Sequence, residues 1–155
     1  MFKTMRRKEK LLSKEDTIQI LEKAEFGTLA CIGQNGYPYS VPLNYAYDNG
    51  VIYFHSATTG NKLENMHFNN KVSFSAVMYH KVLPDKFDTE YDSAVLFGKA
   101  ARITDELEKR RALILLVEKY SKDHLVQGIE YIGKGMNATA VYKIDIEHMT
   151  GKHGR

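Results

Sequence analysis

Two Asn-Gly turns constrain the fold of this chain more than any other feature of its sequence. Asn35-Gly36 and Asn49-Gly50 each lie between segments rich in apolar and aromatic residues. Both residue types tolerate the positive φ angles that tight β-hairpin turns require. The pattern therefore predicts three strands joined by two successive hairpins into an antiparallel meander, at residues 26–33, 37–47 and 51–57.

The second of these strands is irregular because it contains two prolines. Pro38 and Pro42 each remove a backbone N–H donor, so regular pairing on both sides is not expected there. Such a strand is typical of a sheet edge, a bulge or a ligand contact. Protection of a sheet edge against aggregation explains the same prolines without any ligand.

The rest of the chain adds three strands and three helices. Alternating or apolar runs predict strands at residues 71–79, 91–103 and 138–146, with a loop at 80–89. Helix capping and apolar spacings of three and four predict helices at 13–25, within 58–67 and at 105–120, whereas 121–137 matches no single pattern. Six strands with peripheral helices favour a mainly β fold, an antiparallel barrel or sandwich. A Rossmann layout is disfavoured because strands and helices do not alternate.

Length and composition predict a single domain over residues 1–155. Hydrophobic residues make up 43% and charged residues 26% of the chain, which is close to the average for globular proteins. We interpret residues 1–12 as a solvated basic arm, rather than a nucleic-acid contact, because few aromatic residues interleave the charges. Residues 151–155 are expected to form a mobile tail.

The sequence also predicts where the protein resides. No segment approaches the roughly 20 apolar residues that cross a bilayer, and no apolar run follows the charged N-terminus. We therefore expect a cytoplasmic protein that binds neither membrane nor nucleic acid. Cys31, the one cysteine, lies in an apolar run and is interpreted as a buried structural thiol.

Common catalytic signatures are missing from the sequence. There is no Walker-type phosphate loop, no His-Glu-x-x-His, no Gly-x-Ser-x-Gly and no Cys-x-x-Cys. The six histidines show no spacing typical of metal ligands, so no metal is assigned. A hydrolase of these classes, an NTPase or a metalloenzyme is disfavoured.

One segment has the composition of an anion site. Thr58, Thr59, Gly60 and Lys62 follow the strand that ends at His55 and precede a short helix. Free N–H groups at a helix start, short hydroxyls and one cation together bind phosphate. The alternative is a surface helix with an ordinary exposed lysine.

These segments together resemble the FMN-binding split-barrel proteins related to pyridoxamine 5′-phosphate oxidase, within them the nitroimidazole-resistance branch. The resemblance lies in the order and spacing of five segments, at residues 22–30, 36–45, 52–57, 60–65 and 91–100. It implies an FMN-binding split barrel, antiparallel and Greek-key-like, that forms a homodimer with flavin at the subunit interface. FAD remains an alternative to FMN.

The resemblance also implies which residues contact the flavin. The isoalloxazine ring would lie along one strand and the ribityl phosphate at the end of another, with a further contact from a later strand. The implied residues are Val41, Pro42, Leu43 and Asn44 for the ring, His55, Ser56, Ala57, Lys62 and Asn65 near the phosphate, and Ser93 as the later contact.

His55 is the candidate catalytic residue in this reading. The resemblance places it near the flavin, where it would orient a nitroaromatic substrate or pass a proton; a histidine that only forms structural hydrogen bonds is the alternative. The predicted function is an FMN-dependent oxidoreductase acting on a small molecule, with nitroaromatics as candidate substrates. Two rival functions are flavin storage without catalysis, and haem binding through His55 or His153. The chain lacks the basic C-terminal signature of true pyridoxamine-phosphate oxidases, so that activity is not expected.

Overall fold

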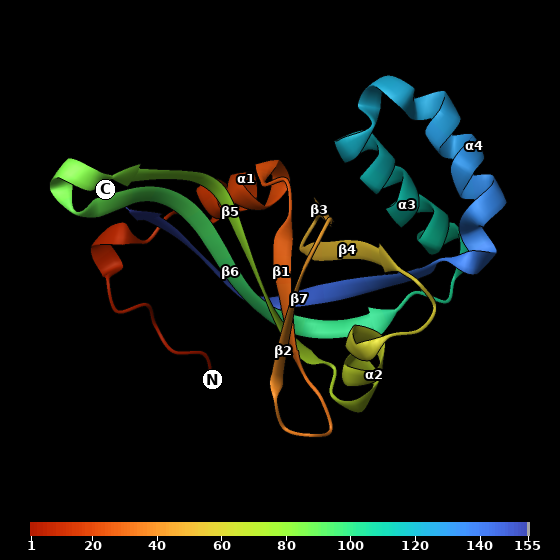
Figure 1. The fold of residues 1–155 in the computed structure, drawn as a ribbon, viewed down its shortest axis with the longest axis horizontal. Helices are drawn as coiled ribbons and strands as arrows, with labels where there is room; N and C mark the ends of the chain where they lie inside the picture. The colour runs from red at the N-terminus through yellow and green to blue at the C-terminus, as the bar shows by residue number, and fades with distance from the viewer. Residues whose placement is uncertain (155) are drawn as a thin grey trace.

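The computed structural model describes residues 1–154, which form seven strands and four α-helices (Figure 1). The strands are β1 (Gly27–Ile32), β2 (Pro38–Leu43), β3 (Ala46–Asp48), β4 (Val51–Ser56), β5 (Lys71–Leu83), β6 (Asp88–Arg102) and β7 (Ala140–Gly154). The helices are α1 (Lys14–Lys23), α2 (Asn61–Phe68), α3 (Glu106–Tyr120) and α4 (Leu125–Gly135), with short 3-10 turns at Lys8–Lys10, Pro84–Lys86, Lys122–His124 and Met136–Ala138.

One antiparallel sheet, ordered β2-β1-β5-β6-β7-β4-β3, closes on itself as a barrel. Its two edge strands, β2 and β3, are consecutive in the chain and only Asn44 and Tyr45 separate them. Because each residue spans at most about 3.5 Å, the edges lie within roughly 10 Å of each other and the sheet must curl. The predicted antiparallel barrel is confirmed, and the fold is a split barrel.

The predicted meander is wrong, although both hairpins exist. β1 pairs with β2 and β3 pairs with β4, but β2 and β3 lie at opposite edges of the sheet. The expected strand at residues 37–47 is therefore interrupted at Asn44 and Tyr45. Within residues 1–154, β2 pairs only with β1, so its two prolines lie on an edge strand, where missing donors cost least.

The predicted loop at residues 80–89 is instead the end of a long hairpin. β5 and β6 stay paired as far as Leu83 and Asp88, around a turn in which Phe87 has a φ of 50°. Side chains at this end are mostly exposed on both faces. A hairpin that is exposed on both faces does not need apolar residues at every second position. The alternation that predicts a strand is therefore missing there.

The predicted mobile tail is wrong for residues 151–154, which complete β7. Gly151 and Gly154 pair with Ala94 and Tyr91 of β6, and a side chain at Gly151 would collide with Thr17 of α1. Backbone pairing and this close approach hold the segment, and neither depends on apolar residues. Arg155 lies outside the described residues.

Two buried clusters lie on either side of β4. The larger fills the barrel with β-strand residues and α1; the smaller lies between the outer surface of β3, β4 and β7 and the helices α3 and α4. Figure 1 shows these two helices side by side at one end of the molecule, away from the N-terminal arm. Residues 121–137, which the sequence left unassigned, supply α4 and the short turns that flank it.

The N-terminal arm is only partly solvated. Its charged residues are mostly exposed, whereas the Phe2 ring stacks on His148 and Phe97 and Leu11 bridges to Lys152 of β7. No helix within residues 1–154 combines the length and apolar content needed to cross a membrane.

Candidate functional site

β4 presents alternate side chains to two different environments. Its last two residues, His55 and Ser56, point to opposite faces of the sheet. Ile52, Phe54 and Ser56 point into the barrel, whereas Tyr53 and His55 point outward, toward α3 and α4. The period of two in a strand produces this division. Two adjacent residues therefore carry their polar groups to opposite faces of the sheet.

Ser56 carries an orphaned polar atom. The residue is 8% exposed, and its Oγ finds no hydrogen-bond partner among the described residues. A buried hydroxyl without a partner costs free energy, because it gives up water and receives nothing in return. This position therefore has an unused donor and acceptor at the end of β4.

Lys62 lies close enough to His55 for its charge to affect the imidazole. Burial lowers the pKa of His55 and the positive charge of Lys62 lowers it further, so His55 is neutral at pH 7. Lys62 is in the first turn of α2, after a four-residue link that begins at Ala57. The structure thus places Lys62 near His55, whereas Ser56 points to the other face of β4, and the phosphate site stays a prediction.

Asn44 joins this group through the register of β3 and β4. Ala46 pairs with Tyr53, so continuing the ladder by two residues places Asn44 opposite His55. Both line a cavity of about 220 Å³. The other lining residues come from α3, α4 and the turns after them: Leu113, Leu116, Val117, Tyr120, Ser121, Tyr131, Ile132, Gly135, Met136 and Thr139.

Val41, Pro42 and Leu43 lead to this cavity along the edge strand β2. Val41 and Leu43 pack against the barrel core and Pro42 is exposed. Over the described chain the far side of β2 has no strand partner, so part of its backbone is free for a ligand. The geometry is compatible with a ring held by main-chain groups.

The Asn65 side chain points toward Cys31 of β1. Its amide group donates to Cys31 Sγ at 3.8 Å, and its Oδ1 lies against Gly33, which directly follows β1. Burial raises the pKa of the Cys31 thiol, and the contact with Asn65 offsets this in part. These contacts support the interpretation of Cys31 as a structural thiol, and they explain Asn65 as a residue that attaches α2 to β1.

Ser93 is far from the other predicted residues in the same chain. It pairs with Lys152 of β7, whereas His55 pairs with Val141, eleven residues away along the same strand. At about 3.3 Å per residue this separation is roughly 36 Å. One flavin in one chain does not reach both His55 and Ser93.

The sequence reading missed two groups of residues near the site. Arg102, the last residue of β6, lines a second cavity of about 480 Å³ together with Thr58, Thr59 and Gly60. The apolar residues of α3 and α4 line the first cavity. Only the amphipathic pattern of 105–120 signalled one of these elements, and nothing marked Arg102.

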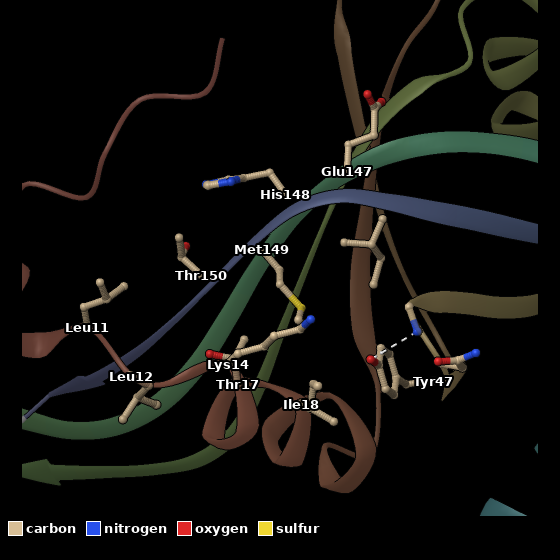
Figure 2. A pocket seen from close by; sticks show the side chains of 13 residues that line it. Leu11, Leu12, Lys14, Thr17, Ile18, Tyr47, Glu147, His148, Met149 and Thr150 are labelled. Carbon is tan, nitrogen blue, oxygen red and sulfur yellow. Dashed lines mark hydrogen bonds between the residues drawn. The ribbon is translucent and has the colours of Figure 1, made fainter.

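A larger cavity, about 730 Å³, lies away from the candidate site (Figure 2). Figure 2 shows Lys14 and Ile18 of α1 facing Met149 and Tyr47 across it. The Tyr47 hydroxyl accepts a hydrogen bond from the Gly50 N–H. None of the predicted flavin residues lines this cavity.

The family of the chain follows from its sequence as a whole. A family model described as pyridoxamine 5′-phosphate oxidase matches residues 13–153. The chain belongs to this family. The pyridoxamine 5′-phosphate oxidase family has the flavin-binding split-barrel fold described above, so the resemblance found in the sequence is confirmed. A search of curated proteins gave no significant match.

Solved structures agree with membership of the pyridoxamine 5′-phosphate oxidase family. A candidate 5-nitroimidazole antibiotic resistance protein from Bacteroides thetaiotaomicron is 28% identical, with a TM-score of 0.77 over 93% of this chain and 86% of that one. An FAD-binding protein from Mesorhizobium loti is 24% identical (TM-score 0.66; 94% and 97% covered). An FAD and haem binding protein from Mycobacterium smegmatis is 18% identical (TM-score 0.75; 92% and 72% covered). The last two show the fold alone.

The two histidines named as haem ligands lie far apart. His55 pairs with Val141 and His153 lies twelve residues further along β7, where its Nδ1 contacts Asp92 Oδ1. The separation along the strand is roughly 40 Å. Because either histidine alone was the predicted axial ligand, this distance does not test haem binding, which stays a prediction.

Proposed function

We propose that this chain binds FMN, with the phosphate held at the end of β4 and the start of α2. The observation that carries the proposal is the Ser56 hydroxyl, which is buried and unpartnered within the described chain and directly follows His55, whose pKa the charge of Lys62 lowers. A phosphate oxygen supplies the partner that Ser56 lacks, and Lys62 supplies a counter-charge. Ala57 adds backbone to the same turn.

In this proposal the isoalloxazine ring lies along the end of β2. Val41, Pro42, Leu43 and Asn44 offer backbone groups on an edge strand, and Asn44 and His55 face one cavity. Bound flavin would supply the redox chemistry. The protein orients the ring, limits the access of water from the helix side, and holds a neutral imidazole where a substrate would meet the flavin.

A homodimer completes the proposed site. Ser93 is too far from His55 to contact the same flavin in one chain, whereas a second copy brings its own Ser93 to the interface. The outer face of β1, β5 and β6 exposes Ile32 (43%), Val77 (53%) and Val95 (41%) among small residues. Covering such a face with a second copy buries apolar surface that is otherwise hydrated.

The proposed reaction is reduction of a nitroaromatic small molecule of the 5-nitroimidazole type. The 28% identity to a candidate 5-nitroimidazole resistance protein supports it, as does the cavity beside His55. In its neutral form His55 donates a hydrogen bond from its N–H to a nitro oxygen and acts as a proton relay. Flavin storage without turnover is the competing function.

Flavin titration of Lys62→Ala tests the binding proposal. Losing a charge-assisted hydrogen bond weakens FMN binding by about 1–3 kcal/mol, which is roughly ten- to hundredfold. Lys23→Ala, an exposed lysine in the last turn of α1, is the matched control and binds FMN as the wild type does. Equal affinity in all three proteins would remove Lys62 from the site.

Turnover separates catalysis from storage. Purified flavin-loaded protein is supplied with NADH or NADPH and 2-methyl-5-nitroimidazole, and the loss of nitro absorbance is followed against free FMN at the same concentration. We expect the protein to exceed free FMN and His55→Ala to lose most of that excess while retaining flavin. A rate equal to that of free FMN supports storage.

A further inference from the structure

The cavity beside His55 is lined by apolar side chains together with neutral polar ones, which include the hydroxyls of Tyr120, Ser121 and Thr139. Leu116, Val117 and Ile132 are among its walls, and Asn44 and His55 supply polar groups. Among residues 1–154, no Lys, Arg, Asp or Glu lines it. Burying an ion there would lack compensation, so the cavity selects uncharged molecules.

The volume of the cavity is large enough for a small ring. It measures about 220 Å³, whereas an apolar cavity of about 150 Å³ is enough to bind benzene. Pockets for drug-sized ligands start at about 300 Å³. A five- or six-membered ring with one or two small substituents fits this space.

Three glycines of α4 differ in what a side chain would meet. At Gly128 an added Cβ would lie 2.5 Å from Val117 Cγ1, so the close packing of α4 on α3 requires glycine there. At Gly133 and Gly135 it would meet no atom of the described chain within 4 Å. Of the three, only Gly135 lines the cavity, where it is half-buried; Gly133 is exposed.

The backbone of Gly135 does not require glycine. Its φ of −104° and ψ of 0° are open to any L-residue, in contrast to the positive φ of Gly36 or Gly50. Neither packing nor backbone conformation therefore explains this glycine. Glycine at this position leaves open volume beside Met136 and Ile132, where α4 forms a wall of the cavity.

We propose that Gly135 sets the size limit of the cavity beside His55, which takes one uncharged aromatic ring. This deepens the proposed function, since it takes His55 as the end of the cavity at which the substrate reacts. A side chain at position 135 shortens the space available to the ring without touching the phosphate residues Ser56 and Lys62. Binding of the ring and binding of the flavin are then separable.

The test measures binding of 2-methyl-5-nitroimidazole to the full chain by calorimetry or ligand-observed NMR. Flavin content is first recorded for each protein by its absorbance. We expect Gly135→Leu to weaken ring binding at least tenfold and Gly135→Ala to weaken it by a smaller factor. Gly133→Leu is the matched control, because it places the same side chain on the same helix outside the cavity, and it binds the ring as the wild type does.

The outcomes separate this inference from the proposed function. If Gly135→Leu, folded by circular dichroism, binds the ring as tightly as Gly133→Leu, the size limit is overturned while flavin binding stands. If the wild type binds no ring at all, the inference is overturned as well. If no protein retains flavin, the proposed function fails, yet the ratio of ring affinities between the two leucine variants still decides the role of Gly135.

A second variant tests the size limit in the opposite direction. Leu116→Ala removes a wall of the cavity on α3 and is expected to bind 5-nitroindole, a bicyclic ring, more tightly than the wild type does. Equal binding of 5-nitroindole by the wild type and Leu116→Ala would also overturn the inference.

Discussion

The barrel interior and the space between β4 and the two C-terminal helices lie on opposite faces of the same strand, yet they are packed differently. In the barrel, Tyr45, Phe54 and Phe74 are completely or almost completely buried. On the helix side, Leu113 and Leu116 keep 8% and 6% of their surface exposed and border a cavity. The barrel interior is filled with large side chains, and the helix side is left partly open.

This difference gives the two faces of the sheet different roles: the closely packed barrel interior contributes stability, and the helix side has space for a ligand. A close-packed interior resists substitution because any removed group leaves a void. A half-open cluster holds α3 in place but keeps room for a ligand. Ser56 and His55 are neighbours in sequence, and each belongs to a different one of these environments.

The largest expected effect is a loss of stability on truncating a side chain in the closely packed barrel interior. Phe74→Ala is predicted to lower the free energy of unfolding by about 3–5 kcal/mol, because Phe74 is 1% exposed and packs edge-on against Tyr45. Leu116→Ala, next to an existing cavity, is predicted to cost only about 2 kcal/mol. Urea denaturation of both variants measures the difference. Equal losses would mean that the two clusters are packed alike.

The second prediction concerns the Tyr120 hydroxyl, which connects α3 to the backbone at Tyr45 and Glu25. Tyr120 Oη of α3 accepts a hydrogen bond from the Tyr45 N–H at 3.1 Å, and it also contacts the Tyr45 and Glu25 carbonyl oxygens. Tyr120→Phe is predicted to cost about 1–3 kcal/mol, because these backbone groups lose their partner.

Thermal or urea unfolding measures this cost against a matched control. Tyr131→Phe removes the hydroxyl of a tyrosine that is 80% exposed on α4, and we expect a change of at most about 0.5 kcal/mol. If Tyr120→Phe behaves like this control, α3 is held to the barrel by apolar contacts alone.

The smallest expected effect is a pH dependence at the boundary between the two sides. The Lys119 ammonium lies 3.8 Å from the centre of the Tyr45 ring, and burial lowers its pKa to about 8. The ring face opposes this shift by attracting the charged form. An unfolded lysine has a pKa of 10.5, so between pH 8 and about 10.5 the unfolded chain binds more protons.

The contribution of Lys119 to the free energy of unfolding therefore rises as pH increases from about 8 toward 10. Below pH 8 both states are charged and the cost of burying the charge is fully present. Burial raises the pKa of Tyr45 and Tyr120, so ionisation of these residues in the unfolded chain reverses the trend at higher pH. Urea midpoints of the wild type and Lys119→Met across pH 7–10 measure the effect. The same slope in both proteins would assign it to other groups.

Much of the architecture was predictable because it depends on local chemistry. At the second Asn-Gly turn, Asn49 and Gly50 adopt the positive φ angles that the hairpin signal implies. Ser13 caps α1 by accepting a hydrogen bond from the Asp16 N–H, as the capping pattern indicates. The strands with one buried face were found by their alternation, and those without a buried face were missed.

The candidate site was predictable in part, since the residues proposed to bind phosphate lie close together in the chain. His55, Ser56 and Lys62 belong to one strand end and the next helix, so their proximity follows from local structure. The approach of Asn44 to His55 depends on the β3–β4 register, and the cavity depends on α3 and α4. The distance between Ser93 and His55 follows from the length of β7 and has no sequence signal.

The sequence by itself determined the turns, the caps, the alternation of strands and the family, because each depends on residues a few positions apart or on their order along the chain. Only the tertiary structure decided that β2 and β3 occupy opposite edges, that Asn65 attaches to Cys31, and that α4 leaves open volume at Gly135. The physical reason is that closure of a barrel and packing of a helix pair are set by non-local contacts, which no short pattern encodes.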